Sequence, residues 1–134
     1  MNRVKDWFNQ GEYDLSAART SHASGHYEWA CFQSQQAAEK VLKALLLSLN
    51  ITETGNSLVH LLRRVEEKKP LDEFEELLER CQDLDRHYIQ TRYPSSYSSG
   101  YPADYYNQKI ANTCIDHAIT IVSFVNSELG GSSE

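Results

Sequence analysis

Hydrophobic residues recur at intervals of three or four along most of the chain, which is the spacing of one face of an α-helix. The first such stripe consists of Val4, Trp7, Phe8, Gly11, Leu15, Ala18 and His22. A glycine inside a helix costs about 1 kcal/mol relative to alanine, so Gly11 either admits a close neighbour or is simply tolerated. Ser24 and Gly25 interrupt the pattern, and Gly25 suits the position that terminates a helix.

The segment 26–49 predicts the clearest helix of the chain, because two adjacent rows of mostly small and apolar residues run along it. One row holds Ala30, Gln33, Ala37, Val41, Ala44 and Ser48, and the other holds Ala38, Leu42, Leu45 and Leu49. A stripe this wide implies that the helix contacts more than one neighbour. A loop is expected over 50–56, and Ser57 is placed to cap a short helix from 58 to about 68.

Two further helices are predicted in the second half of the chain. After Pro70, one stripe holds Phe74, Leu77, Cys81, Leu84 and Tyr88, and the last stripe holds Ile110, Cys114, Ala118, Ile121, Val125 and Leu129. The stretch 91–106 contains two prolines and a glycine and cannot be helical throughout. The sequence therefore predicts an all-α, antiparallel up-and-down bundle of about five helices, four long and one short, over residues 1–129, with a flexible tail at 130–134.

Length and charge narrow the class of protein. A chain of 134 residues with 40% hydrophobic content suffices for one domain with a single core. Lys and Arg total 13 and Asp and Glu total 19, so the net charge is −6. This balance argues against a protein that coats DNA with a broad basic face but permits a local basic cleft. No apolar run approaches the ~20 residues of a membrane span and no signal peptide is visible, so a cytoplasmic protein with no membrane segment is expected.

The cysteines and histidines do not predict a metal site. Cys31, Cys81 and Cys114 are far apart and form no C-x-x-C pair, so we interpret them as buried free thiols in a reducing compartment. His22 and His26 have a metal-ligand spacing, but no thiol or carboxylate nearby completes a site. Glycine-rich phosphate loops, GxSxG and HExxH are absent. Neither a metal nor another cofactor is therefore expected.

The tyrosine-rich stretch that follows the fourth predicted helix is a candidate binding surface. It opens with Thr91, Arg92, Tyr93 and Pro94. Pro94 disfavours helical geometry at Tyr93, and an arginine at the resulting turn can hold a phosphate while tyrosines stack on bases. In the alternative interpretation, Arg92 caps the last carbonyls of the fourth helix and the tyrosines pack over the end of the bundle. Whether the loop 94–104 is ordered is left open.

A second candidate site pairs Arg80 with His87 on the fourth predicted helix. Seven residues are nearly two turns, which places both side chains on one face about 10 Å apart, with Asp83 positioned to orient the imidazole. An arginine for phosphate and a histidine for proton transfer suit RNA cleavage through the 2′-hydroxyl without a metal. The alternative is an exposed Asp–His pair beside a solvated arginine. His60 and His117 are expected on helix surfaces.

Lys40 and Lys43 lie near the middle of the second predicted helix. Glu39 and Lys43 form an i, i+4 pair worth a few tenths of a kcal/mol. The two lysines either reach an anionic ligand in a groove or solvate the helix.

Three stretches resemble the HEPN (higher eukaryotes and prokaryotes nucleotide-binding) domain family. The first is Trp7 with Y-D-L-S-A-A at 13–18, the second is Y-x-x-A-C-F-x-x-Q-Q-A-A-E-K-x-L-K-A at 27–44, and the third is L-D-x-x-Y-x-x-T-R-Y-P at 84–94. The resemblance covers nearly the whole chain, from about residue 2 to 129. It implies an antiparallel helical bundle that is usually a homodimer.

The resemblance also implies nucleotide or RNA binding, often beside a small nucleotidyltransferase in toxin–antitoxin pairs. Some members are metal-independent ribonucleases with an R-x(4–6)-H motif, a spacing that Arg80 and His87 meet. Cys81 departs from the polar residue that usually follows the arginine, similar members tend to have tyrosine where His87 stands, and Asn56 replaces a histidine common in the family.

Three functions follow for the chain. The favoured one is a dimeric module that binds nucleotide or RNA through Arg92, Tyr93, Lys40 and Lys43 and acts with a nucleotidyltransferase partner. The alternatives are a ribonuclease toxin that uses Arg80 and His87, and a dimerisation scaffold that binds only protein.

Overall fold

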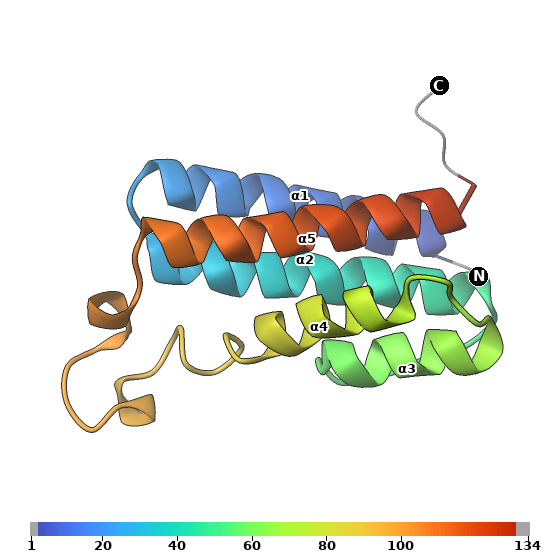
Figure 1. Ribbon diagram of the computed structural model, residues 1–134. Coiled ribbons are helices and arrows are strands. Elements are labelled where there is room, and N and C mark those ends of the chain that lie inside the picture. The colour runs from blue at the N-terminus through green and yellow to red at the C-terminus, as the bar shows by residue number, and fades with distance from the viewer. Residues whose placement is uncertain (1–2, 131–134) are drawn as a thin grey trace.

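Five α-helices and two short 3₁₀ helices make up the computed structural model, which describes residues 3–130 (Figure 1). They are α1 (Val4–Ala23), α2 (Tyr27–Ser48), α3 (Leu58–Lys68), α4 (Phe74–Asp85), η1 (Pro94–Ser96), η2 (Pro102–Tyr105) and α5 (Gln108–Glu128). No strand occurs within residues 3–130, which confirms the all-α prediction. Residues 131–134 of the expected tail lie outside the described part, and no described helix is long and apolar enough to cross a membrane.

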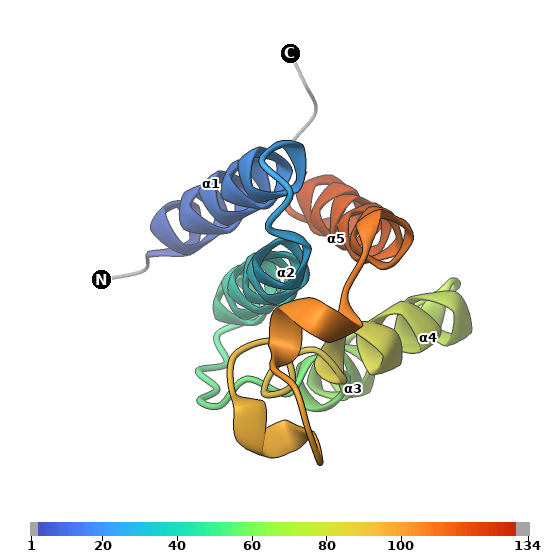
Figure 2. The same cartoon turned by 90° about the vertical axis from the view of Figure 1, so that its left-hand side faces the viewer.

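The central element of the bundle is α2, which contacts α1, α3, α4 and α5 (Figure 2). Its two predicted rows face these neighbours, and Ala30, Ala37, Ala38, Val41, Leu42 and Ala44 are fully buried. At Gly11 the helices α1 and α2 approach so closely that an added Cβ would lie 2.6 Å from Cγ1 of Val41. The glycine therefore admits a close neighbour.

The predicted helix boundaries in the first half of the chain are confirmed. The Ser57 hydroxyl accepts a hydrogen bond from the backbone N–H of His60 at 3.1 Å and caps α3. Gly25 has a φ of +81°, the left-handed conformation that glycine adopts readily after a helix. All three cysteines are buried and free, as expected.

The fourth helix is shorter than predicted, because it ends at Asp85 rather than near Tyr88. At the end of α4, the Asp85 carboxylate accepts hydrogen bonds from the first two backbone N–H groups of α3. These are the N–H groups of Leu58 and Val59, at 3.0 and 3.1 Å. Beyond it the backbone tightens into turns with i to i−3 hydrogen bonds, such as His87 N–H to Leu84 C=O. α4 therefore has 12 residues, close to the 11 residues of α3.

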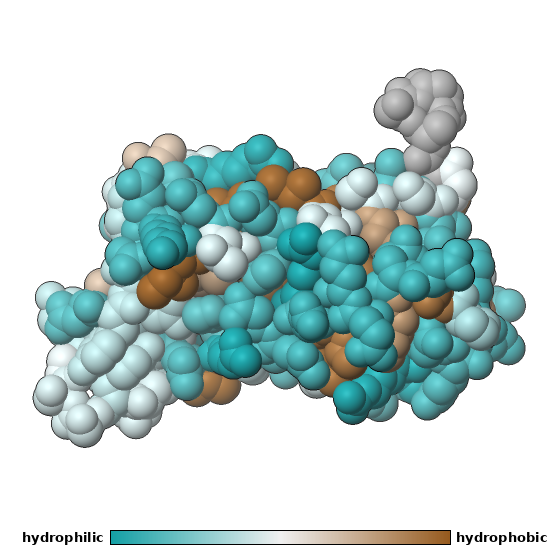
Figure 3. Space-filling model, viewed as in Figure 1, coloured by the Kyte–Doolittle hydropathy of each residue, from teal (hydrophilic) through white to brown (hydrophobic). Residues whose placement is uncertain are grey.

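The stretch 91–106 folds back on itself at one end of the bundle, where Figure 3 shows it as a pale projection. The rings of Tyr97 and Tyr105 stack with centroids 4.1 Å apart. Their hydroxyls donate to the backbone carbonyls of Gln90 and Ser99. The loop therefore has a defined conformation, in which these two tyrosines pack against each other.

Candidate functional site

The most distinctive polar surface surrounds Arg92, in the turn that follows α4. Its guanidinium carbon lies 4.3 Å from the ring centroid of Phe32, 4.6 Å from that of Tyr88 and 5.1 Å from that of Tyr93. We call these four side chains the Arg92 cradle. Cations over aromatic faces are held by the ring quadrupole, more strongly where water is partly excluded. The Trp29 side chain extends the aromatic surface through an edge contact with Phe32.

Arg92 donates two hydrogen bonds, from Nε at 2.9 Å and from one terminal nitrogen at 2.7 Å, both to the carbonyl oxygen of Tyr88. The alternative interpretation placed Arg92 on the last carbonyls of the fourth helix, whereas the carbonyl that it contacts lies in the turn, three residues beyond the end of α4. Within residues 3–130, no carboxylate lies at ion-pair distance from Arg92, whereas the other two partly buried arginines pair with Glu53 and Glu76 respectively. The positive charge of the cradle is therefore uncompensated, and one terminal nitrogen remains available as a donor.

A buried network of hydrogen bonds supports the Arg92 cradle from inside the protein. The Gln35 side chain is fully buried and donates to the carbonyl of Asn56 at 2.8 Å and to Asp85 at 3.3 Å. The Asn56 amide in turn donates to the Tyr88 hydroxyl at 2.6 Å. The buried Thr91 hydroxyl donates to the His87 carbonyl at 2.8 Å. The L-D-x-x-Y-x-x-T-R-Y-P stretch thus forms one hydrogen-bonded unit that presents Arg92 and the half-exposed Tyr93 outward.

Lys40 and Lys43 project from α2 but carry local counter-charges. The Lys40 ammonium lies 2.8 Å from the Asp14 carboxylate of α1, and the Lys43 ammonium lies 2.9 Å from Glu39. The predicted Glu39–Lys43 pair is therefore present. Lys40 is eight residues beyond Phe32, about 12 Å along the helix axis. Both lysines are thus neutralised and belong to the α1–α2 surface rather than to the cradle.

Arg80 and His87 engage different partners. One terminal nitrogen of Arg80 lies 3.2 Å from Nδ1 of His117 in α5, and the other lies 3.1 Å from Glu76. The Nδ1 atom of His87 instead lies 2.7 Å from the Tyr106 hydroxyl. Because α4 ends before His87, the His87 side chain does not lie on the helix face where it was expected beside Arg80.

Two further expectations about this region were wrong. Asp83 does not orient His87; its carboxylate accepts from Nε2 of His117 at 2.8 Å and from Arg86 at 2.7 Å. His117, expected on a helix surface, is the partly buried centre of this network, with 17% of its side chain exposed. Since an arginine only donates, Nδ1 of His117 accepts from Arg80 and Nε2 donates to Asp83. The signal for this role was the position of His117, three residues after Cys114 on the buried stripe of α5.

Two other groups near His87 have pKa values above their ordinary ones. Burial raises the pKa of the Tyr106 hydroxyl above its ordinary value, and the neighbouring Tyr97 adds to this effect. A hydrogen bond with Cys31 and, as the second cause, burial raise the pKa of the Cys114 thiol. Both groups are therefore neutral near pH 7.

The protein is an all-α bundle whose helices pack around α2. A network of polar hydrogen bonds links the turn after α4 to the start of α3. A family model described as the HEPN domain matches residues 4–128, and the chain therefore belongs to the HEPN domain family. This confirms the resemblance found in the sequence.

Similar proteins come from archaea and thermophilic bacteria. The putative toxin MJ1304 of Methanocaldococcus jannaschii is 26% identical over 133 residues, which cover 94% of this chain and 88% of that protein. The crystal structure of TT1696 from Thermus thermophilus superposes with a TM-score of 0.90 at 38% identity, over 96% of this chain and 99% of that one. The structure of ST0689, an archaeal HEPN homologue, gives a TM-score of 0.80 at 40% identity with the same two coverages.

Proposed function

We propose that this protein is a nucleotide- or RNA-binding module whose ligand binds at the Arg92 cradle. The observation that carries the proposal is the uncompensated charge of Arg92 on an aromatic platform. A phosphate accepts from the remaining terminal nitrogen of Arg92, and a base stacks on Tyr93, a residue that is 47% exposed. The net charge of −6 disfavours extended electrostatic binding, so the contact is short-range and confined to this surface.

The test measures binding of mononucleotides by thermal shift and of a short labelled single-stranded RNA by fluorescence anisotropy. These two ligands distinguish a nucleotide site from an RNA site. We expect Arg92→Gln to weaken binding about 10-fold, or about 1.4 kcal/mol, and Tyr93→Ala to weaken it by a similar factor. Arg63→Gln is the matched control, because Arg63 is an exposed arginine on α3.

Salt dependence adds a second readout to the same experiment. One phosphate contact predicts a slope of about −0.7 in log K against log salt for single strands, whereas a multi-lysine surface gives a steeper one. Circular dichroism of each variant establishes that the fold is kept. Wild-type protein that binds neither ligand at millimolar concentration would support the protein-binding scaffold instead, and an Arg92→Gln variant with unchanged affinity would place the site elsewhere.

The proposed assembly is a homodimer that acts with a nucleotidyltransferase partner in the cytoplasm. Apolar side chains beside the cradle support a protein contact there, since Trp29 and Ile89 are 43% and 50% exposed. The three free cysteines agree with a reducing compartment. Sedimentation of the purified chain measures the dimer, and co-purification with the product of the neighbouring gene tests the partner.

The second candidate is a ribonuclease toxin that uses Arg80 and His87, and the relative named a putative toxin favours it. In one chain the two side chains bind His117 and Tyr106 respectively, so this activity requires them to converge in an assembled cleft. Incubation of RNA with the protein in EDTA, beside Arg80→Ala and His87→Ala, tests it. Cleavage that both substitutions abolish would establish this function, and intact RNA with the wild type would exclude it.

A further inference from the structure

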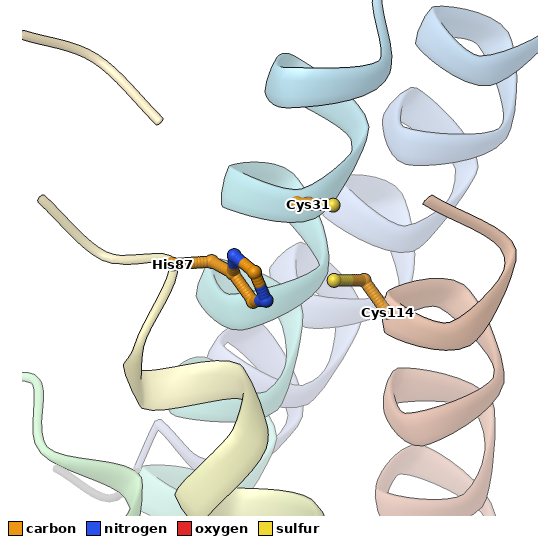
Figure 4. A group of neighbouring side chains, drawn as sticks. All are labelled: Cys31, His87 and Cys114. Carbon is orange, nitrogen blue, oxygen red and sulfur yellow. The ribbon is translucent and has the colours of Figure 1, made fainter. Parts of the chain in front are cut away.

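Cys31, His87 and Cys114 converge from three different parts of the chain (Figure 4). Cys31 lies on α2, Cys114 on α5, and His87 in the turn after α4. Their sulfur and ring-nitrogen atoms all lie within 4.8 Å of one another. Both cysteines are buried, with exposed fractions of 0% and 1%, and His87 is partly buried.

We propose that these three side chains form a binding site for a soft transition-metal ion, with Zn²⁺ as the ion to test. Two thiolates and an imidazole are the donor set that zinc and Cu(I) prefer, whereas Ca²⁺ and Mg²⁺ require oxygen ligands. The proposal goes beyond the binding function of the Arg92 cradle and does not depend on it.

The geometry needs little adjustment to hold a metal. Zinc–sulfur bonds of about 2.3 Å and zinc–nitrogen bonds of about 2.0 Å in a tetrahedral site place two sulfur atoms ~3.8 Å apart and a sulfur and a nitrogen ~3.6 Å apart. Ligand atoms that now lie within 4.8 Å of one another must therefore approach by no more than ~1.2 Å. Figure 4 shows the imidazole directed toward the two sulfur atoms. The Tyr106 hydroxyl holds Nδ1 of His87, which leaves Nε2 as the ligand. Zinc-binding histidines commonly have such a partner on the other ring nitrogen, because it fixes the orientation of the ring.

The protonation balance is simple. Zinc binds cysteine as thiolate, so coordination by the two thiol groups releases two protons, one from each cysteine, and forms two zinc–thiolate bonds. The resulting charges cancel, which removes the cost of burying an isolated ion. His87 contributes a neutral nitrogen, and a water molecule takes the fourth position, as in other sites with three protein ligands.

Titration of metal-free, reduced protein with Co²⁺ tests the proposal, because cobalt–thiolate bonds absorb in the near ultraviolet and Zn²⁺ displaces the cobalt. We expect one ion per chain and a rise in melting temperature with Zn²⁺. The signal and the rise should both disappear in Cys31→Ser and Cys114→Ser. Cys81→Ser is the matched control, because Cys81 is equally buried but lies outside the cluster, and it should retain both.

Because a substituted buried cysteine can impair folding, His87→Gln provides an independent variant at a partly exposed position. It should weaken Zn²⁺ binding at least 10-fold while the metal-free melting temperature changes little. The proposal would be overturned if folded wild-type protein shows no cobalt–thiolate absorption, if Cys114→Ser keeps it, or if Cys31 and Cys114 form a disulfide, with a loss of two hydrogens by mass spectrometry, in place of binding metal.

Discussion

Gly11→Ala tests the close packing of α1 against α2, on which the rest of the bundle depends. In an isolated helix this substitution stabilises by about 1 kcal/mol, because alanine has the higher helix propensity. Here the added Cβ would lie 2.6 Å from Cγ1 of Val41 and 3.0 Å from the carbonyl oxygen of Ala37. The second contact is with backbone, so rotation of the Val41 side chain alone does not relieve it.

The magnitude follows from these two opposing effects. Forcing an extra methyl group into a well-packed core typically costs about 1–3 kcal/mol, and here a shift of one helix against the other puts the cost at the upper end. After subtraction of the propensity gain, we expect Gly11→Ala to lower the free energy of unfolding by about 1–2 kcal/mol. Val41→Ala removes the first contact, so the same substitution should cost at least ~1 kcal/mol less in that background.

Urea unfolding at one fixed protein concentration measures these differences. Glu12→Ala, at the next and exposed position of α1, is the control and should change stability by no more than about 0.5 kcal/mol. If Gly11→Ala is as stable as the wild type or more stable, the two helices do not approach as described, and the explanation of this glycine is wrong.

Three further predictions concern polar contacts between elements. Asp85→Ala should lower the free energy of unfolding by about 2–3 kcal/mol, because two backbone N–H groups of α3 lose a charged acceptor; urea unfolding measures it, and an unchanged midpoint would refute the capping role. His117→Ala should cost about 1–3 kcal/mol in the same assay, since its two partners on α4 lose their contact, and a neutral effect would contradict this. Hydrogen bonds from Arg64 and His60 lower the pKa of Glu53, so their contribution is present above the ordinary value of 4.5 and is lost as the pH falls through the lowered pKa. Stability measured from about pH 5 to pH 3 should therefore fall more in the wild type than in Arg64→Gln, and equal slopes would refute the pairing.

The sequence was sufficient for the fold because the informative signals are local. Apolar spacing identifies the helices, and the Ser57 cap and the glycine at position 25 mark the start of α3 and the end of α1; each of these signals acts within a few residues. Even the wide stripe of 26–49 identified the central helix, because only a helix with several neighbours needs apolar residues over so much of its surface.

The end of α4 was missed because its cause lies in a distant segment. Tyr88 continues the apolar stripe from Leu84, so the local pattern favours a longer helix. The Asp85 carboxylate instead serves backbone groups 26 and 27 residues earlier in the chain. No local pattern records such a contact, and the expected alignment of Arg80 with His87 depended on the missing turn.

The charges of the candidate sites were unpredictable for a similar reason. Lys40 is neutralised by Asp14, which lies on another helix, and nothing in the spacing of α2 indicates this pairing. The Cys31–His87–Cys114 cluster likewise unites residues 56 and 27 positions apart, far outside the short spacings by which metal sites are recognised in sequences.

The turn after α4 is the element on which both proposed sites depend. In a regular helix, successive side chains are about 100° apart around the axis. The tight turns beyond Asp85 do not follow this spacing. They place His87 beside the two buried thiols and Arg92 at the surface, against its aromatic rings. The hydrogen bond from the Thr91 hydroxyl to the carbonyl of His87 ties the two parts of this turn together. Binding residues are often found in irregular backbone that a rigid scaffold holds in place. Here the buried hydrogen bonds of Gln35 support the turn.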